Sequence, residues 1–127
     1  MTEHLKGLVI KPNWADLILD GVKTWEIRGS ATKHRGPVYI IKSGSGEIFG
    51  AARLVECRPF TIDDYHECGY FHQLNNISLF TRYNQPWAWV FEDAVRFKEP
   101  LSYQHPQGAV IWVNLPHSIL DDPPLWV

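Results

Sequence analysis

The sequence predicts an α+β protein in which short strands form a small mixed β-barrel with helices packed across its ends. Apolar segments with strand character recur five or six times between glycine- and proline-containing turns, and one amphipathic helix comes early in the chain. Strands and helices do not repeat as βαβ units, which favours this mixed barrel. The 127 residues are long enough for one domain, expected over residues 1–116 with a C-terminal tail at 117–127.

The chain begins with a strand and a short helix. Gly7–Ile10 is a short apolar run that predicts a buried strand, and Asn13 is a good N-cap for a helix from about Trp14 to Asp20. The predicted apolar stripe of this helix consists of Trp14, Leu17 and Ile18. Gly21 is placed to end the helix in a left-handed turn.

The segment Lys23–Arg28 is the most informative part of the sequence. As a strand it places Thr24, Glu26 and Arg28 on one face and Trp25 and Ile27 on the other. Lys23 lies at the start of this strand. A carboxylate and a guanidinium two residues apart can orient each other and bind a polar ligand. A purely structural Glu26–Arg28 pair is the alternative.

Two more strands and two helical segments follow. Pro37–Lys42 is rich in β-branched residues and predicts a strand, Ser43–Gly46 predicts a tight turn, and 48–57 predicts a strand that ends before Pro59. The sequence Thr61-Ile-Asp-Asp64 has the pattern of a capping box and predicts a helix. Residues 78–83 predict a further helical turn.

The last third of the chain returns to strand patterns. Trp87–Phe91 predicts a strand that 93–97 continues or follows, and Pro100 is expected to end it. Gly108–Leu115 predicts a strong final strand. The tail ends in an acidic, proline-containing segment, and Trp126 is expected to dock this tail on the domain.

The net charge of −2 hides an asymmetry between the two halves of the chain. Residues 1–58 hold nine Lys or Arg against six Asp or Glu, whereas residues 59–127 hold three against eight. Much of this surface would therefore repel a long polyanion but not a nucleotide, a single exposed base or a short strand end, and chance scatter of surface charges is the alternative. No apolar run approaches the roughly 18 residues of a membrane span, and the N-terminus is unlike a signal peptide, so we expect a cytoplasmic protein.

Metal binding is not expected. Cys57 and Cys68 predict free thiols, because the chain shows no export signal. His66, Cys68 and His72 lie close in sequence, but no Cys-x-x-Cys pair accompanies them. The sequence therefore predicts neither a metal nor a cofactor.

Several motifs together resemble one family. They are Leu8-Val-Ile-Lys-Pro12, Trp14-Ala15, Gly21-x-Lys23-x-x-Glu26-x-Arg28, Lys42-Ser43 at a strand end, Trp87-x-Trp89-Val-Phe-Glu92 and Gln107-Gly108. This combination resembles the ASCH domain, which is similar to the PUA domain, and it extends from about Gly7 to Pro116. The resemblance implies a compact β-barrel with flanking helices and RNA or nucleotide binding in a positive cleft beside the Lys23–Arg28 segment.

The resemblance also implies possible enzymatic activity, because some ASCH proteins cut RNA and one bacterial group looks like an amidohydrolase acting on N4-acetylcytidine. That group has the motif Lys-Thr-x-Thr-x-Arg, in which the second threonine is taken as the nucleophile. This chain keeps Lys23, Thr24 and Arg28 but has Glu26 at the nucleophile position. The difference argues against amide hydrolysis by that route.

These observations give one set of predicted site residues. Arg28 and Lys23 would hold an anion and Glu26 would read a base edge, with Thr24 on the same strand face as Glu26. The other predicted binding residues are Lys11, Lys42, Ser43 and, for base stacking, Trp14 or Trp87. Core packing is the alternative for both tryptophans.

The predicted partner is RNA, another single-stranded nucleic acid or a modified nucleoside. If the protein is an enzyme, Lys23 and Glu26 would polarise a water molecule for hydrolysis of a modified nucleoside or of RNA. A protein-interaction domain is the third hypothesis.

Overall fold

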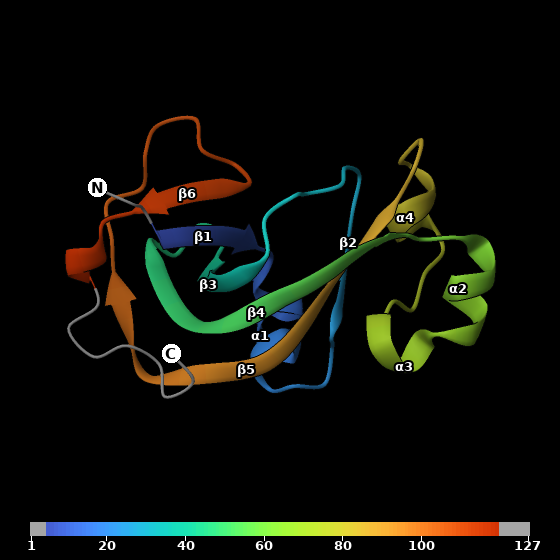
Figure 1. Ribbon diagram of the computed structural model, residues 1–127, viewed down its shortest axis with the longest axis horizontal. Helices are drawn as coiled ribbons and strands as arrows, with labels where there is room; N and C mark the ends of the chain where they lie inside the picture. The colour runs from blue at the N-terminus through green and yellow to red at the C-terminus, as the bar shows by residue number, and fades with distance from the viewer. Residues whose placement is uncertain (1–4, 120–127) are drawn as a thin grey trace.

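The computed structural model describes residues 5–119 (Figure 1). In chain order the elements are β1 (Leu5–Ile10), α1 (Pro12–Leu19), β2 (Trp25–Arg28), β3 (Gly36–Lys42), β4 (Glu47–Pro59), α2 (Ile62–Glu67), α3 (Gly69–His72), α4 (Ser78–Thr81), β5 (Trp87–Ser102), β6 (Trp112–Leu115) and a 3-10 turn at His117–Ile119. No helix within this part of the chain is long and apolar enough to cross a membrane.

The strands form one mixed six-stranded sheet in the order β2-β5-β4-β3-β1-β6. β1 runs parallel to β3, and the other neighbours are antiparallel. The long strands β4 and β5 bend together through three register shifts, which curve the sheet (Figure 1). Because β2 and β6 remain at opposite edges, the sheet is open and the predicted closed barrel is not confirmed.

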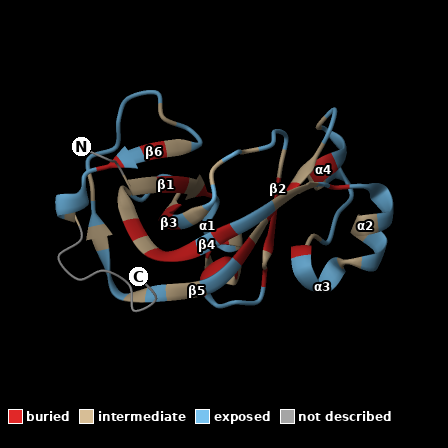
Figure 2. Cartoon of the chain, viewed as in Figure 1, coloured by how far each residue is buried: buried red, intermediate tan, exposed pale blue. Residues whose placement is uncertain are grey.

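Three apolar clusters form the core: one lies between the sheet and α1, a second joins β1, β3, β4 and β6, and a third joins the sheet to α2 and α4. The buried parts of the strands are marked in Figure 2. Helix α1 buries Ala15, Ile18 and Leu19 against the sheet. In the cluster next to the short helices, Trp25 of β2 packs with Phe60 and Phe80, which come from the segment between β4 and β5. Strand β2 therefore connects the sheet to the short helices.

Several predicted boundaries are confirmed. Gly21 has a φ of 76° and ends α1 as expected. Thr61 caps α2 in a capping box, because its hydroxyl accepts from the Asp64 amide and the Asp64 carboxylate accepts from the Thr61 amide. The expected docking of Trp126 lies outside the described residues.

Other boundaries are wrong for identifiable reasons. Helix α1 starts at Pro12, whose fixed φ suits the first helical position, so Asn13 lies inside the helix and is not its cap. β5 passes through Pro100, next to an irregular stretch of the ladder where a missing amide is tolerated. β6 is only four residues long, because Gly108 adopts a φ of 83° in a turn with Gln107 and the chain bends at residues 110–111 before the strand begins.

Two further differences concern the segment around the short helices. β4 does not end before Pro59 but includes it, because Pro59 lies at the end of the strand opposite Trp87 and needs no further ladder bond. Helix α3 was not predicted from its four residues. It is too short to show an apolar period, and its place is set by contacts with β2.

Candidate functional site

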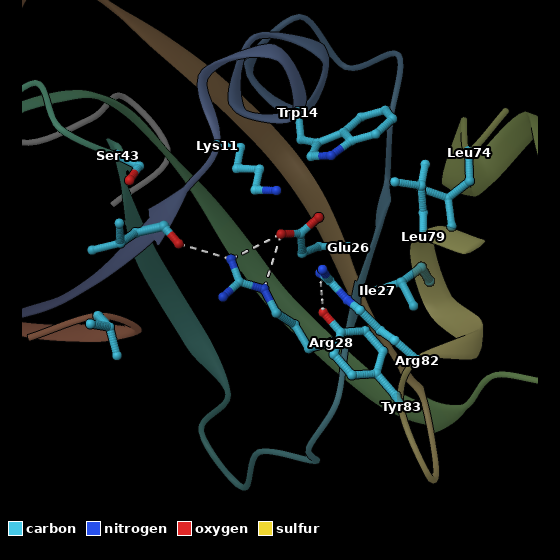
Figure 3. Close-up of a pocket in the computed structure, with 12 residues that line it drawn as sticks. Lys11, Trp14, Glu26, Ile27, Arg28, Ser43, Leu74, Leu79, Arg82 and Tyr83 are labelled. Carbon is cyan, nitrogen blue, oxygen red and sulfur yellow. Dashed lines mark hydrogen bonds and ion pairs between the residues drawn. The ribbon is translucent and has the colours of Figure 1, made fainter. Parts of the chain in front are cut away.

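A cleft of about 250 Å³ opens where β1, β2 and the segment before β5 meet (Figure 3). Its walls combine charged and apolar side chains, and they come from segments distant in sequence. The lining residues are Val9, Lys11, Trp14, Glu26, Ile27, Arg28, Ser43, Leu74, Leu79, Arg82, Tyr83 and Val110.

Glu26 and Arg28 form the polar wall of the cleft. Both Nε and Nη2 of Arg28 lie within 3.0 Å of Glu26 Oε2, and Nη2 also donates to the Val9 carbonyl at 2.9 Å. The guanidinium is thus fixed between β2 and β1. Glu26 is only 6% exposed, yet no hydrogen bond among the described residues involves its Oε1. This oxygen faces the cleft, so it can accept a hydrogen bond from a ligand there.

Lys23 lies beneath the cleft and does not line it. Its side chain is 1% exposed, its Nζ donates to the His72 carbonyl, and Glu26 Oε1 lies 3.9 Å away. The ammonium also lies 4.9 Å from the centre of the Trp14 ring, where a cation–π contact is favourable. Burial lowers the pKa of Lys23 from 10.5 to about 8, although the Glu26 carboxylate opposes this shift. Lys23 therefore positions Glu26 and Trp14 from below.

The rim of the cleft carries exposed cations on both sides. Lys11 follows β1, and Arg82 follows α4, where its Nη2 donates to the Tyr83 hydroxyl at 2.9 Å. The Tyr83 ring can approach β2 because residue 29 is glycine: a Cβ there would lie 2.6 Å from the ring. Trp14 is half-buried and presents the remaining part of its indole to the cleft (Figure 3).

The structure brings five of the predicted site residues together on the cleft, namely Lys11, Trp14, Glu26, Arg28 and Ser43. It places the other four elsewhere. Thr24 lines a separate cavity of about 140 Å³ beside Lys23 and β5. Lys42 pairs with Asp16 at 2.7 Å and lies over the Phe49 ring, while Trp87 packs against the core.

Sequence reasoning missed the contribution of the segment before β5. Leu74, Leu79, Arg82 and Tyr83 form one wall of the cleft, more than 40 residues after β2. No local pattern links these residues to Glu26. Gly29, which leaves room for the Tyr83 ring, was the one available signal, and it became meaningful only with the structure.

The histidine and cysteine residues of this segment do not assemble a metal centre within residues 5–119. His72 is instead a packing residue: its Nε2 faces the Tyr65 carbonyl at 2.9 Å, and its Nδ1 accepts from the Leu74 amide at 2.8 Å. Burial lowers the pKa of His72, so the neutral ring is favoured. Cys57 and Cys68 are free thiols.

The curved mixed sheet, the helix packed on it and the charged cleft define a small α+β domain. The model of the ASCH domain matches residues 8–101, and the chain belongs to the ASCH domain family. No curated protein matches the sequence.

Solved structures with a similar fold include the ASCH protein of Zymomonas mobilis. That structure is 16% identical in sequence, with a TM-score of 0.70 over 91% of this chain and 90% of the other. A serine-to-alanine mutant of the same protein gives 0.71 over 94% of both chains, and a tyrosine-to-phenylalanine mutant gives 0.70 over 92% and 94%. At this level of identity, the similarity establishes the fold.

Proposed function

We propose that the protein binds RNA or a free nucleotide by holding one base and its phosphate in the cleft. The observation that carries this proposal is the Oε1 atom of Glu26 on the cleft, which has Lys23 Nζ 3.9 Å away and takes no hydrogen bond from the described residues. Cytosine and adenine present exocyclic amines, which are the donors such an oxygen would accept from. Uracil and hypoxanthine present a carbonyl at the same position and would leave Glu26 without a donor.

The charges around Glu26 support an anionic ligand. Arg28 uses Nε and Nη2 in fixed contacts, whereas no hydrogen bond among residues 5–119 uses its Nη1. Lys11 and Arg82 add exposed positive charge at the rim. A phosphate bound between these groups would gain charge-assisted hydrogen bonds, and the half-buried Trp14 would provide a stacking surface for the base.

Calorimetric titration with four nucleoside monophosphates tests this proposal. We expect CMP and AMP to bind about tenfold or more tightly than UMP and IMP, because a site built to accept an amine rejects a carbonyl. Glu26→Gln should remove this discrimination, since an amide can also donate. Glu56→Gln, an exposed position on β4 outside the cleft, is the matched control. Equal affinity for all four nucleotides, or no saturable binding by the folded protein, would contradict the proposal.

The salt dependence provides a second test of the same site. Each phosphate contact to single-stranded RNA contributes a slope of about −0.7 in a plot of log K against log salt. Arg82→Ala should flatten this slope, whereas Lys98→Ala, an exposed position on β5 away from the cleft, should leave it unchanged. Identical slopes for the two variants would argue against a phosphate at Arg82.

Hydrolysis of a modified nucleoside or of RNA is a second candidate, favoured by the same Oε1 atom. In that case Glu26 would take a proton from a bound water molecule, and buried Lys23 would act only by positioning Glu26. Release of acetate from N4-acetylcytidine, lost in Glu26→Gln, would support hydrolysis. A folded protein that neither binds nucleotides nor releases acetate would instead favour a protein-interaction domain.

A further inference from the structure

A second cavity, of about 480 Å³, adjoins the cleft. The two share Val9, Ser43 and Val110 among their lining residues. One wall of the second cavity is the Ser43–Gly46 turn between β3 and β4, and the other is the segment that connects β5 to β6. The cleft alone, at about 250 Å³, is smaller than the roughly 300–1,000 Å³ typical of ligand sites, whereas the cleft and the second cavity together fall within that range.

The second cavity differs from the cleft in its chemistry. Among residues 5–119, no Lys, Arg, Asp or Glu lines it, whereas the cleft holds Arg28, Lys11 and Arg82. Its walls carry the aromatic rings of Tyr103 and His105, whose centroids lie 5.7 Å apart, and the exposed hydroxyl of Ser43. The phosphate therefore belongs in the cleft, and the second cavity suits an uncharged, planar group with polar edges.

The two rings are held in place by a chain of hydrogen bonds. The carbonyl of Ala109 can only accept, so the proton of neutral His105 lies on Nε2, 2.7 Å from that oxygen. Nδ1 then accepts from the Tyr103 hydroxyl at 2.7 Å. The His105 ring is thus exposed but oriented, which reduces the entropy lost when a base stacks on it.

Val110 stands at the boundary between the two cavities and is 75% exposed. An exposed apolar side chain there costs little to desolvate, and it can separate two neighbouring bases as apolar wedges do at base steps. Lys11 lies on the cleft side of this boundary and Ser43 lines both cavities, so the phosphate that joins two nucleosides would pass between them.

We propose that the cleft and the second cavity form one site for two consecutive nucleosides, with the first base and the linking phosphate in the cleft and the second base against His105. This inference rests on the proposed function and narrows its ligand to a single-stranded dinucleotide or a longer strand. A mononucleotide would fill only half of the site.

Titration with matched diesters tests the inference. CpU and UpC are compared with cytidine 3′-methyl phosphate and cytidine 5′-methyl phosphate, which carry the same phosphodiester charge without a second nucleoside. We expect at least one dinucleotide to bind about tenfold more tightly than its methyl ester, as one additional stacked base allows. His105→Ala should abolish this advantage and leave the affinity for the methyl ester unchanged. His105→Phe, which keeps a ring, should retain most of it.

A control variant and the possible negative results distinguish failure of this inference from failure of the proposed function. His66→Ala, an exposed histidine on α2 outside both cavities, should behave as the wild type. If the methyl esters bind and neither dinucleotide binds more tightly, or if the advantage survives in His105→Ala, the inference is overturned and the proposed function stands. If neither class of ligand binds the folded protein, both fail.

Discussion

The buried ammonium of Lys23 predicts an unusual pH dependence of stability. In the unfolded chain this lysine holds its proton up to about pH 10.5, whereas in the folded protein its pKa is about 8. Between these values the unfolded state binds more protons, so raising the pH favours the folded state. Lowering the pKa from 10.5 to about 8 corresponds to about 3 kcal/mol in the free energy of unfolding, a contribution fully present above pH 10.5 and lost as the pH falls through 8.

Urea unfolding of the wild type and of Lys23→Met, between pH 7 and pH 11, measures this contribution. The free energy of unfolding of the wild type should rise by about 3 kcal/mol relative to the variant over this range. Other groups that titrate there, including Tyr39 and Tyr103, whose pKa values are raised by burial, affect both proteins and cancel in the difference. Lys98→Met, an exposed lysine on β5, should show no such change.

The reasoning would be refuted by a difference between wild type and Lys23→Met that stays constant across this range of pH. Such a result would mean that water reaches the Nζ atom or that Glu26 compensates its burial fully. A difference in the free energy of unfolding that falls with rising pH would also refute it, because the ion pair with Glu26 would then have to outweigh the cost of burying the charge.

Two further predictions concern packing and capping. Gly50→Ala should destabilise the protein by about 3 kcal/mol or more, because the added Cβ would press on the Val95 carbonyl and the Leu19 side chain. Gly69→Ala should be nearly neutral, because no atom of the described residues lies within 4 Å of the added Cβ, and equal thermal melting of the two variants would contradict this packing. Thr61→Ala should cost about 1 kcal/mol in urea unfolding, because it removes the hydroxyl that accepts from the Asp64 amide, and an unchanged midpoint would show that the capping box contributes nothing.

Local patterns in the sequence were sufficient to predict the two residues that form the polar wall of the cleft. The two-residue period of β2 places Glu26 and Arg28 on one face, and the structure shows them paired there. Lys23 departs from this pattern because it precedes the regular strand. Its side chain turns under Trp14 to reach the His72 carbonyl, which lies 49 residues further along the chain.

Non-local contacts account for most of what the sequence could not predict. Lys42 has a favourable position at the end of β3, yet α1 brings Asp16 within 2.7 Å of it, and Arg96 of β5 binds the same carboxylate. Only the tertiary structure reveals that this lysine already has a partner. Barrel closure likewise depends on how β4 and β5 bend, and their register shifts leave no periodic signal in the sequence.

The attachment of β2 has a consequence for the motions of the protein. Its ladder partner in the sheet is β5, while beyond the strand the Thr24 amide donates to the Phe71 carbonyl and Lys23 donates to the His72 carbonyl. Opening of the short helices would therefore remove one side of the cleft while the rest of the sheet persisted. A bound nucleotide should thus slow amide hydrogen exchange in residues 69–83 more than in β6, so that segment would report occupancy of the cleft.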